Sequence, residues 1–227
     1  MDPATEAAVA HLKLAWWQEE MQRLMTRSAV HPISSYLAAL PGGASADFTP
    51  LLTAAQAAVA QISGVPLERG ADLETQSQAL WGGPLALVSG LAGGARDDAA
   101  LSDCTRWLAA AAYLARNIRD YRREARAGRV AFAVDELMAA GIDNADLAAD
   151  TAPAHLQAYL RRLHEQAAQY FERALQALPH AQRRADRHLL VLAALGLEHL
   201  QNRGLKLPRR RLKHMLLAWQ TARRTQR

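Results

Sequence analysis

Apolar residues recur along this chain with the three-to-four-residue spacing of amphipathic α-helices. Val9, Leu12 and Trp16 mark one such stripe in a first helix predicted over residues 2–27. Proline and glycine separate the later elements. Further helices are predicted over residues 33–40, 49–64, 72–93 with an interruption at 82–84, 97–126, 153–178, 182–202 and 208–223, with short turns at 134–140 and 144–150.

No flexible linker and no internal repeat interrupts this pattern, so the chain is predicted to form one all-α domain over residues 1–227. Half of the residues are hydrophobic, mostly Ala and Leu, and only 6% are aromatic. Ala and Leu rank highest in helix propensity, whereas strand-forming residues are scarce. This composition excludes an all-β fold.

Cysteine usage and hydropathy bear on the compartment. The single Cys104 excludes a disulfide framework. The apolar runs are far shorter than the roughly 18 residues that a membrane span needs. The first residues also lack the cationic stretch and apolar core of a secretory signal. These features predict a soluble, cytoplasmic protein.

The formal net charge of +5 is unevenly distributed. Residues 183–227 contain twelve Lys or Arg and two acids, which gives +10, while the remainder contains fifteen basic and twenty acidic residues, which gives −5. A basic C-terminal end on a mildly acidic body indicates an anionic partner for that end. A membrane surface, a nucleic acid or an acidic protein would fit.

Three stretches, in this order, resemble motifs of the squalene/phytoene synthase family. Residues 13–24 (KLAWWQEEMQRL), followed by a His-Pro pair, are similar to the family's LAWWREE helix. Residues 115–129 (ARNIRDYRREARAGR), followed by VDEL at 134–137, resemble its second acidic motif, NILRDxxxDAxxGR and then LDEL. Residues 208–219 (PRRRLKHMLLAW) resemble its C-terminal helix, which is basic and then apolar.

The resemblance implies the isoprenoid synthase fold, a single all-α bundle around a deep apolar cavity. Active members join two prenyl diphosphates head to head, and acidic motifs on facing helices hold each diphosphate through Mg²⁺. This ion prefers carboxylate and phosphate oxygens, and carboxylates four residues apart share one helix face. Two such faces are needed to surround the metal cluster and stabilise the departing diphosphate.

This chain departs from the family pattern where Mg²⁺ would bind. Asp120 stands at the first carboxylate of the second motif, but Glu124 replaces the second one, and Arg122 and Arg123 lie between them. Arg116 stands at the family's Asn. Extra cations oppose the accumulation of Mg²⁺. The family's first acidic motif precedes the LAWW helix and has no counterpart here, so the N-terminal helices that carry it are expected to be absent.

The middle of the chain carries a second set of changes. Gln76 stands at the family's active-site Tyr, and Gln78 and Ala79 replace a further Tyr and Arg. Trp81 stands where a small residue normally lines the cavity, and Pro84 is expected to break the helix just beyond. Losses at three separate places favour a member that no longer catalyses the reaction.

Asp120 and Glu124 are therefore candidate metal ligands of a vestigial site, with Arg119 and Arg123 as candidate substrate contacts. The favoured alternative is an ion-paired helix face, because Arg116, Arg119 and Arg123 have the helical spacing that pairs them with the two acids. No catalytic residue is assigned. No cofactor is expected, and Mg²⁺ enters only if the chain is an enzyme.

The basic end supplies a second candidate site. Arg209, Arg210, Arg211 and Lys213 are predicted to contact a protein partner or an anionic membrane surface, with peripheral attachment to the membrane. The alternative is a solvated face that packs against the acidic part of the same domain. Nucleic-acid binding is not expected, because the segment has no DNA-binding motif and almost no aromatic stacking positions.

Three functions remain open. The favoured one is a squalene/phytoene synthase-like protein that has lost prenyl transfer and acts as a binding or assembly module, by analogy with a non-catalytic branch among mitochondrial complex I assembly factors. The second is an active Mg²⁺-dependent prenyl diphosphate transferase of isoprenoid, carotenoid or hopanoid biosynthesis. The third is a carrier of an isoprenoid or quinone, in a cavity that Trp81 and neighbouring leucines would either fill or leave open.

Overall fold

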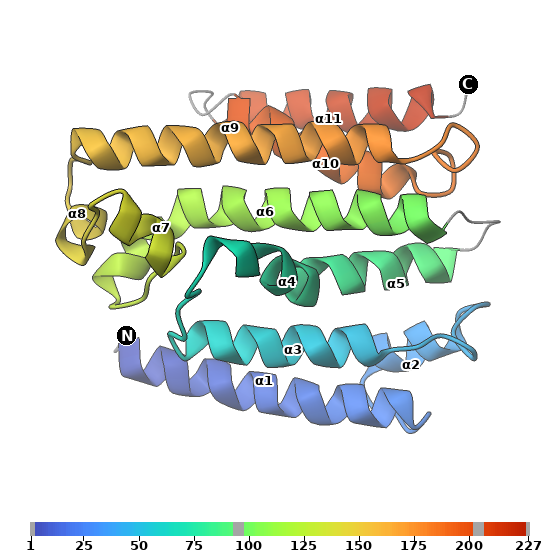
Figure 1. Ribbon diagram of the computed structural model, residues 1–227. Coiled ribbons are helices and arrows are strands. Elements are labelled where there is room, and N and C mark those ends of the chain that lie inside the picture. Colours follow the sequence, from blue (N-terminus) through green and yellow to red (C-terminus); the bar gives the residue numbers. More distant parts are fainter. Residues whose placement is uncertain (1–2, 93–97, 202–206, 226–227) are drawn as a thin grey trace.

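Long helices lie side by side through the molecule, from α1 at one face to α11 at the other (Figure 1). The computed structural model describes the backbone of residues 3–92, 98–201 and 207–225, and the side chains of residues 8–92, 99–200 and 213–225. Within these ranges the chain forms no strand. The elements are α1 (Pro3–Met25), α2 (Pro32–Ala39), α3 (Thr49–Ile62), the 3₁₀ turn η1 (Gly70–Asp72), α4 (Leu73–Ser77), the π-helical turn η2 (Gln78–Gly82), α5 (Gly83–Ala92), α6 (Asp98–Arg126), α7 (Val134–Ala139), α8 (Asn144–Ala148), α9 (Ala154–Ala177), α10 (Arg187–Gln201) and α11 (Leu207–Arg224).

Helices α6 and α9 form the centre of the bundle. They share the most extensive helix–helix contact of the described residues, and α10 packs on α9. One face of α9 is buried, because its apolar residues recur every three or four positions. That face consists of Leu156, Tyr159, Leu163, Ala167, Phe171 and Ala174. This core holds α6 in place and so fixes the direction in which its polar side chains point.

Cys104 lies inside this core, on α6. Its side chain is fully buried, and its thiol donates a hydrogen bond of 3.4 Å to the carbonyl oxygen of Ala174 on α9. Burial, together with the negative charge of Asp186, raises the pKa of the Cys104 thiol to about 12. A buried thiol with a raised pKa is a poor nucleophile, so Cys104 has a packing role in this core.

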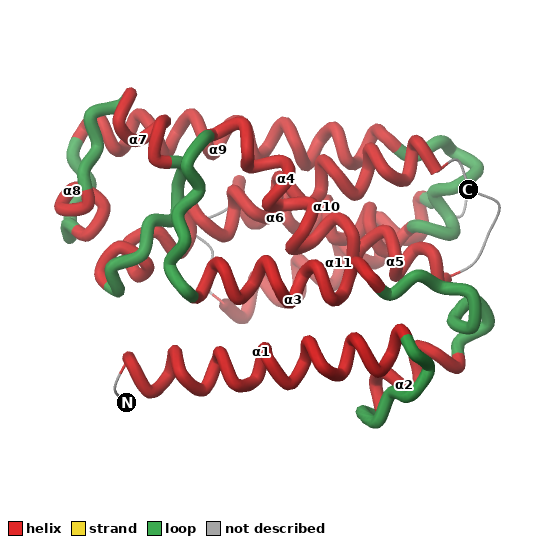
Figure 2. The backbone as a smooth tube through the Cα atoms, turned by 60° about the horizontal axis from the view of Figure 1, so that its bottom comes forward, coloured by secondary structure: helices red, strands yellow, loops and turns green. Residues whose placement is uncertain are grey.

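A smaller apolar cluster joins α1, α2, α3 and α5, with Met21, Leu24 and Phe48 buried at its centre. The view in Figure 2 shows α1 alongside α3, with α2 beyond the C-terminal end of α1. This layer contains the LAWW helix and the His-Pro pair on which part of the sequence resemblance rests.

A buried carboxylate ties α1 to the start of α2. Glu20 is fully buried, and its Oε1 accepts hydrogen bonds from the backbone N–H groups of Val30 (3.0 Å) and His31 (2.8 Å). Burial alone would raise the pKa of Glu20, but these two hydrogen bonds, together with side-chain hydrogen bonds that include one from Arg23, outweigh it and lower the pKa below its ordinary value. The His31 ring also contacts the rings of Trp16 and Trp17. The first family-like motif thus forms a structural joint in this protein.

Two sequence-based boundaries are wrong. Pro84 does not break the helix, and it is the second residue of α5, directly after the π-helical turn η2. The chain instead stays helical from Leu73 to Ala92 through the π-helical turn η2. In addition, α10 begins at Arg187 rather than at Gln182, because backbone hydrogen-bonded turns occupy the residues between Pro179 and Asp186.

No helix within residues 3–92, 98–201 and 207–225 has both the length and the apolar character that crossing a bilayer would require.

Candidate functional site

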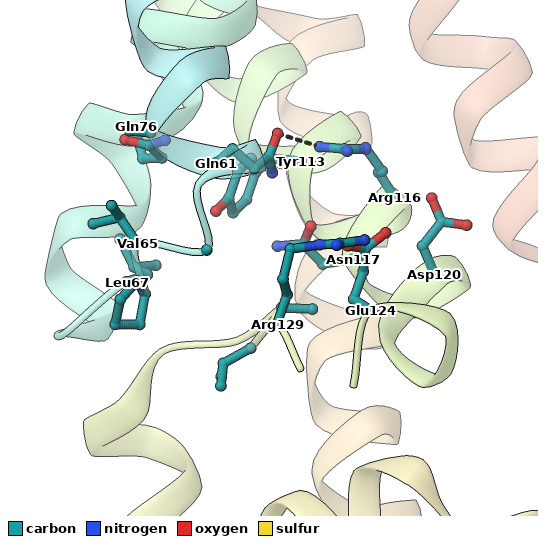
Figure 3. A pocket seen from close by; sticks show the side chains of 15 residues that line it. Gln61, Val65, Leu67, Gln76, Tyr113, Arg116, Asn117, Asp120, Glu124 and Arg129 are labelled. Carbon is teal, nitrogen blue, oxygen red and sulfur yellow. Dashed lines mark hydrogen bonds and ion pairs between the residues drawn. The ribbon is translucent and has the colours of Figure 1, made fainter. Parts of the chain in front are cut away.

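A cavity of about 90 Å³ opens beside the C-terminal half of α6 (Figure 3). The end of α3, helix α4 and the loops around Val65 and Val130 form its other walls. Tyr113, Asn117, Asp120 and Glu124 reach this cavity from α6. These positions are separated by three or four residues, so a single helix face presents them together.

Amide side chains from other elements line the same cavity as this polar face of α6. Gln61 comes from α3 and Gln76 from α4, and both line the cavity. The Nη1 atom of Arg116 donates a hydrogen bond of 2.6 Å to Oε1 of Gln61, which links α6 to α3 across the opening. Arg116 was expected to pair with the acids of α6, and its hydrogen bond goes instead to this glutamine.

Asp120 is held by two guanidinium groups. Arg119 donates from Nε to Oδ1 at 3.0 Å and from Nη2 to Oδ2 at 2.9 Å. Nη2 of Arg123 lies 3.2 Å from Oδ2. The hydrogen bonds from Arg119 lower the pKa of Asp120, and the charges of Arg119, Arg123 and Arg116 add to this effect against partial burial. Asp120 is therefore a carboxylate at neutral pH.

Glu124 is held in the same way, by one arginine on its own helix and one beyond its end. Nε of Arg129 donates to Oε2 at 2.7 Å, and Nη2 of Arg123 donates to Oε1 at 3.1 Å. Partial burial raises the pKa of Glu124, but the hydrogen bonds from Arg129 and Arg123 outweigh it and leave the pKa lowered. Arg129 reaches back to the helix because Gly128 adopts a positive φ of 74° after α6.

These contacts decide whether the pair fits Mg²⁺. All four carboxylate oxygens of Asp120 and Glu124 lie within 3.2 Å of an arginine nitrogen. Mg²⁺ needs free oxygen ligands in octahedral arrangement, and nearby guanidinium charges repel it. In the described part of the chain, no three or more His, Cys, Asp or Glu side chains gather in a way that could hold a metal ion. The pair as arranged does not fit Mg²⁺.

The structure thus brings Asp120, Glu124, Arg119 and Arg123 together as the sequence predicts, and it adds residues that sequence spacing did not single out. Arg129 is one, because helical spacing pairs residues only three or four apart. Tyr113 and Asn117 are others, and they hydrogen-bond to each other. Burial raises the pKa of Tyr113.

The expected role of Trp81 is not met. Its side chain is 42% exposed, and it does not line the cavity beside α6. A second cavity next to the first has a volume of only about 10 Å³. Leu114, Phe132 and Leu163 are among the side chains that close around it. Such a space holds at most about one water molecule.

At the basic end, the side chains of Arg209, Arg210 and Arg211 lie outside the described residues. Lys213 is described, and its side chain is 48% exposed. Its Nζ lies 2.5 Å from Oε1 of Glu198 on α10. This ion pair lies within the basic end itself, because Glu198 is one of the two acids among residues 183–227.

Comparisons with known proteins place this fold. No curated protein sequence matches the chain. Among solved structures, a dehydrosqualene synthase in complex with ligand superimposes with a TM-score of 0.75 at 16% identity, covering 92% of this chain and 76% of that protein. Squalene synthase HpnC from Alicyclobacillus acidocaldarius gives a TM-score of 0.66 at 18% identity, covering 83% and 71%. At these identities the likeness concerns the fold, and it confirms the predicted all-α bundle of the isoprenoid synthase type.

The sequence itself carries the family assignment. Residues 1–217 match the family model described as squalene/phytoene synthase. The match extends over almost the whole chain, so it includes both the joint between α1 and α2 and the arginine-bound acids of α6. The chain belongs to the squalene/phytoene synthase family.

Proposed function

We propose that this protein is a non-catalytic member of its family, which keeps the fold as a binding or assembly module. The observation that carries the proposal is the state of Asp120 and Glu124. Their oxygens are occupied by Arg119, Arg123 and Arg129, so the acidic face that the family motif implies is neutralised from within.

Charge arithmetic supports the same conclusion. Around the two carboxylates, Arg116, Arg119, Arg123 and Arg129 supply four positive charges, which leaves the cluster at +2. Prenyl transfer in the family depends on an excess of negative charge that gathers Mg²⁺ around the diphosphate. A cluster of net positive charge opposes that step, because like charges repel strongly where water is partly excluded.

The direct experiment is an assay of the purified chain with farnesyl or geranylgeranyl diphosphate and Mg²⁺. We expect no head-to-head product above the background of a boiled sample. Formation of such a product at a rate that depends on Mg²⁺ would favour the active transferase and would end the proposal.

A Mg²⁺ titration tests the physical reason separately. The variant Arg119→Gln/Arg123→Gln/Arg129→Gln frees both carboxylates, and we expect it to bind Mg²⁺ at least tenfold more tightly than the unchanged chain, by calorimetry. A control variant, Arg161→Gln/Arg184→Gln/Arg187→Gln, removes the same charge at exposed positions outside the cavity and should leave Mg²⁺ affinity unchanged. An equal gain in Mg²⁺ affinity in both variants would show that overall charge, rather than the arginine contacts of Asp120 and Glu124, controls Mg²⁺ binding.

A further inference from the structure

Helix α11 (Leu207–Arg224) lies at the outer face of the bundle (Figure 1). Its one extensive contact within the described residues is with α10, beside which it runs. The rest of its circumference faces away from the protein, so the residues there show what this surface is suited to meet.

The two sides of α11 differ in burial with helical spacing. His214, Leu217, Ala218, Thr221 and Ala222 are half-buried and recur every three or four positions, as expected for the side that packs on α10. The other side carries large apolar residues in the open. Met215 is 69% exposed, Leu216 is 53% exposed and Trp219 is 54% exposed. Three large apolar side chains within five residues form a patch rather than scattered exposure.

Positive charge lies next to this patch. Arg223 stacks on the Trp219 ring, with its guanidinium carbon 4.5 Å from the ring centroid. Arg224 is exposed as well, and Lys213 is exposed but ion-paired with Glu198 on α10. The sequence of residues 207–224 contains no Asp or Glu. The outward face therefore combines apolar side chains with cations that no acid on the same helix balances.

We propose that the outward face of α11 attaches this protein to the surface of an anionic lipid bilayer. A helix that lies in the membrane interface needs apolar side chains to enter the acyl boundary and cations to pair with headgroup phosphates. Met215, Leu216 and Trp219 supply the first, and Arg223 and Arg224 supply the second. Trp is suited to this depth, because its ring is apolar while its N–H can stay hydrated.

The shape of the surface favours a bilayer over an acidic protein. A single outer helix is convex, so it can sink along its length into a planar interface. A helix-binding protein would instead offer a groove to the apolar stripe. Binding to such a partner would also weaken with salt if the partner carried acidic residues, but it would not depend on lipid composition.

Vesicle co-sedimentation of the full chain distinguishes these cases. We expect binding to vesicles with 30% phosphatidylglycerol in phosphatidylcholine, and at least tenfold weaker binding to pure phosphatidylcholine vesicles. Raising the salt concentration should weaken binding to the anionic vesicles. Tryptophan emission should shift to the blue on binding, and this shift should be mostly lost in Trp219→Phe.

Matched variants locate the surface. The variant Met215→Gln/Leu216→Gln/Trp219→Gln should bind at least tenfold more weakly. The control Met138→Gln/Ile33→Gln/Trp81→Gln changes the same number of apolar residues, of similar type and exposure, elsewhere. It should bind as the unchanged chain does. Arg223→Gln/Arg224→Gln should lose about 25-fold, roughly fivefold for each cation near the surface. Circular dichroism spectra check that each variant stays folded.

The proposal is overturned if the unchanged chain does not bind anionic vesicles, or if neutral and anionic vesicles bind it equally. It is also overturned if the control variant loses as much binding as the α11 variant. None of these outcomes depends on catalysis, so this test and the prenyl transfer assay can fail separately.

Discussion

Arg123 contacts both acids of the α6 stripe at once, through a single Nη2 atom 3.2 Å from Asp120 and 3.1 Å from Glu124. A carboxylate pair four residues apart on a helix repels itself unless a cation lies between its members. In the family motif that cation is a metal ion. In this protein a side chain of the same helix fills the role, with Arg119 and Arg129 on either side.

The lowered pKa values of these acids predict an acid-sensitive part of the stability. A carboxylate whose pKa is lower in the folded state stabilises the fold above its ordinary pKa, here 3.8 for Asp and 4.5 for Glu, and the stabilisation disappears as pH falls through the folded value. At pH 7, Asp120→Asn/Glu124→Gln should therefore unfold with a free energy lower by about 1–2 kcal/mol. This amount is modest because the arginine partners are exposed to water.

Urea unfolding at pH 7 and at pH 3.5 measures this effect. The difference between the variant and the unchanged chain should shrink at pH 3.5. The pKa of Glu20 is lowered too, but Glu20 is present in both proteins, so its contribution cancels in the comparison. A difference that stays constant with pH would mean that the arginines do not stabilise the ionised form.

At the scale of elements, α9 and α10 are in close contact where Gly196 faces Phe171. A Cβ atom on Gly196 would lie 2.3 Å from the ring of Phe171 and has no room. Phe171 is buried in the main core, so its ring cannot simply swing away. The glycine is thus required by packing between two helices, although glycine lowers helix propensity.

The variant Gly196→Ala should lower the free energy of unfolding by about 1–2 kcal/mol, because overpacking costs about 1–3 kcal/mol and alanine recovers part of it through helix propensity. In a Phe171→Leu background the same change should be neutral or stabilising, because the clash is gone. Urea denaturation of the unchanged chain, the two single variants and the double variant gives the coupling free energy between residues 171 and 196. The packing argument fails if Gly196→Ala costs the same in both backgrounds.

The sequence was enough to predict where the long helices lie, but not the direction in which every side chain on them points. Apolar spacing predicts the long helices α6, α9 and α11 to within a few residues, because each buries one face. Trp81 was expected to line the cavity, but it lies within the π-helical turn η2, which takes one more residue per turn and rotates the side chains that come after its start. Such a turn leaves no periodic signal, so the sequence placed Trp81 on the wrong side.

At the scale of the whole molecule, the same limit applies to the site. The sequence predicts Asp120, Glu124, Arg119 and Arg123 as a group because they share one helix. Arg116 meets Gln61 across 55 positions of sequence, and only the packing of α3 against its neighbours sets that contact. The family resemblance gives the fold, while the charges that surround the acids come from this chain alone.

Because Cys104 is fully buried between α6 and α9, its reaction with a thiol reagent reports when the protein core opens. With a pKa of about 12 and no exposed surface, this thiol should resist alkylation in the native state at pH 8. Reaction with iodoacetamide then requires transient unfolding, so the labelling rate, followed by mass spectrometry, should rise with urea in parallel with the unfolding equilibrium. Rapid labelling without denaturant would show that α6 and α9 separate readily. As the chain has one cysteine, each labelled molecule records a single opening of its centre, and no mutation is needed to see it.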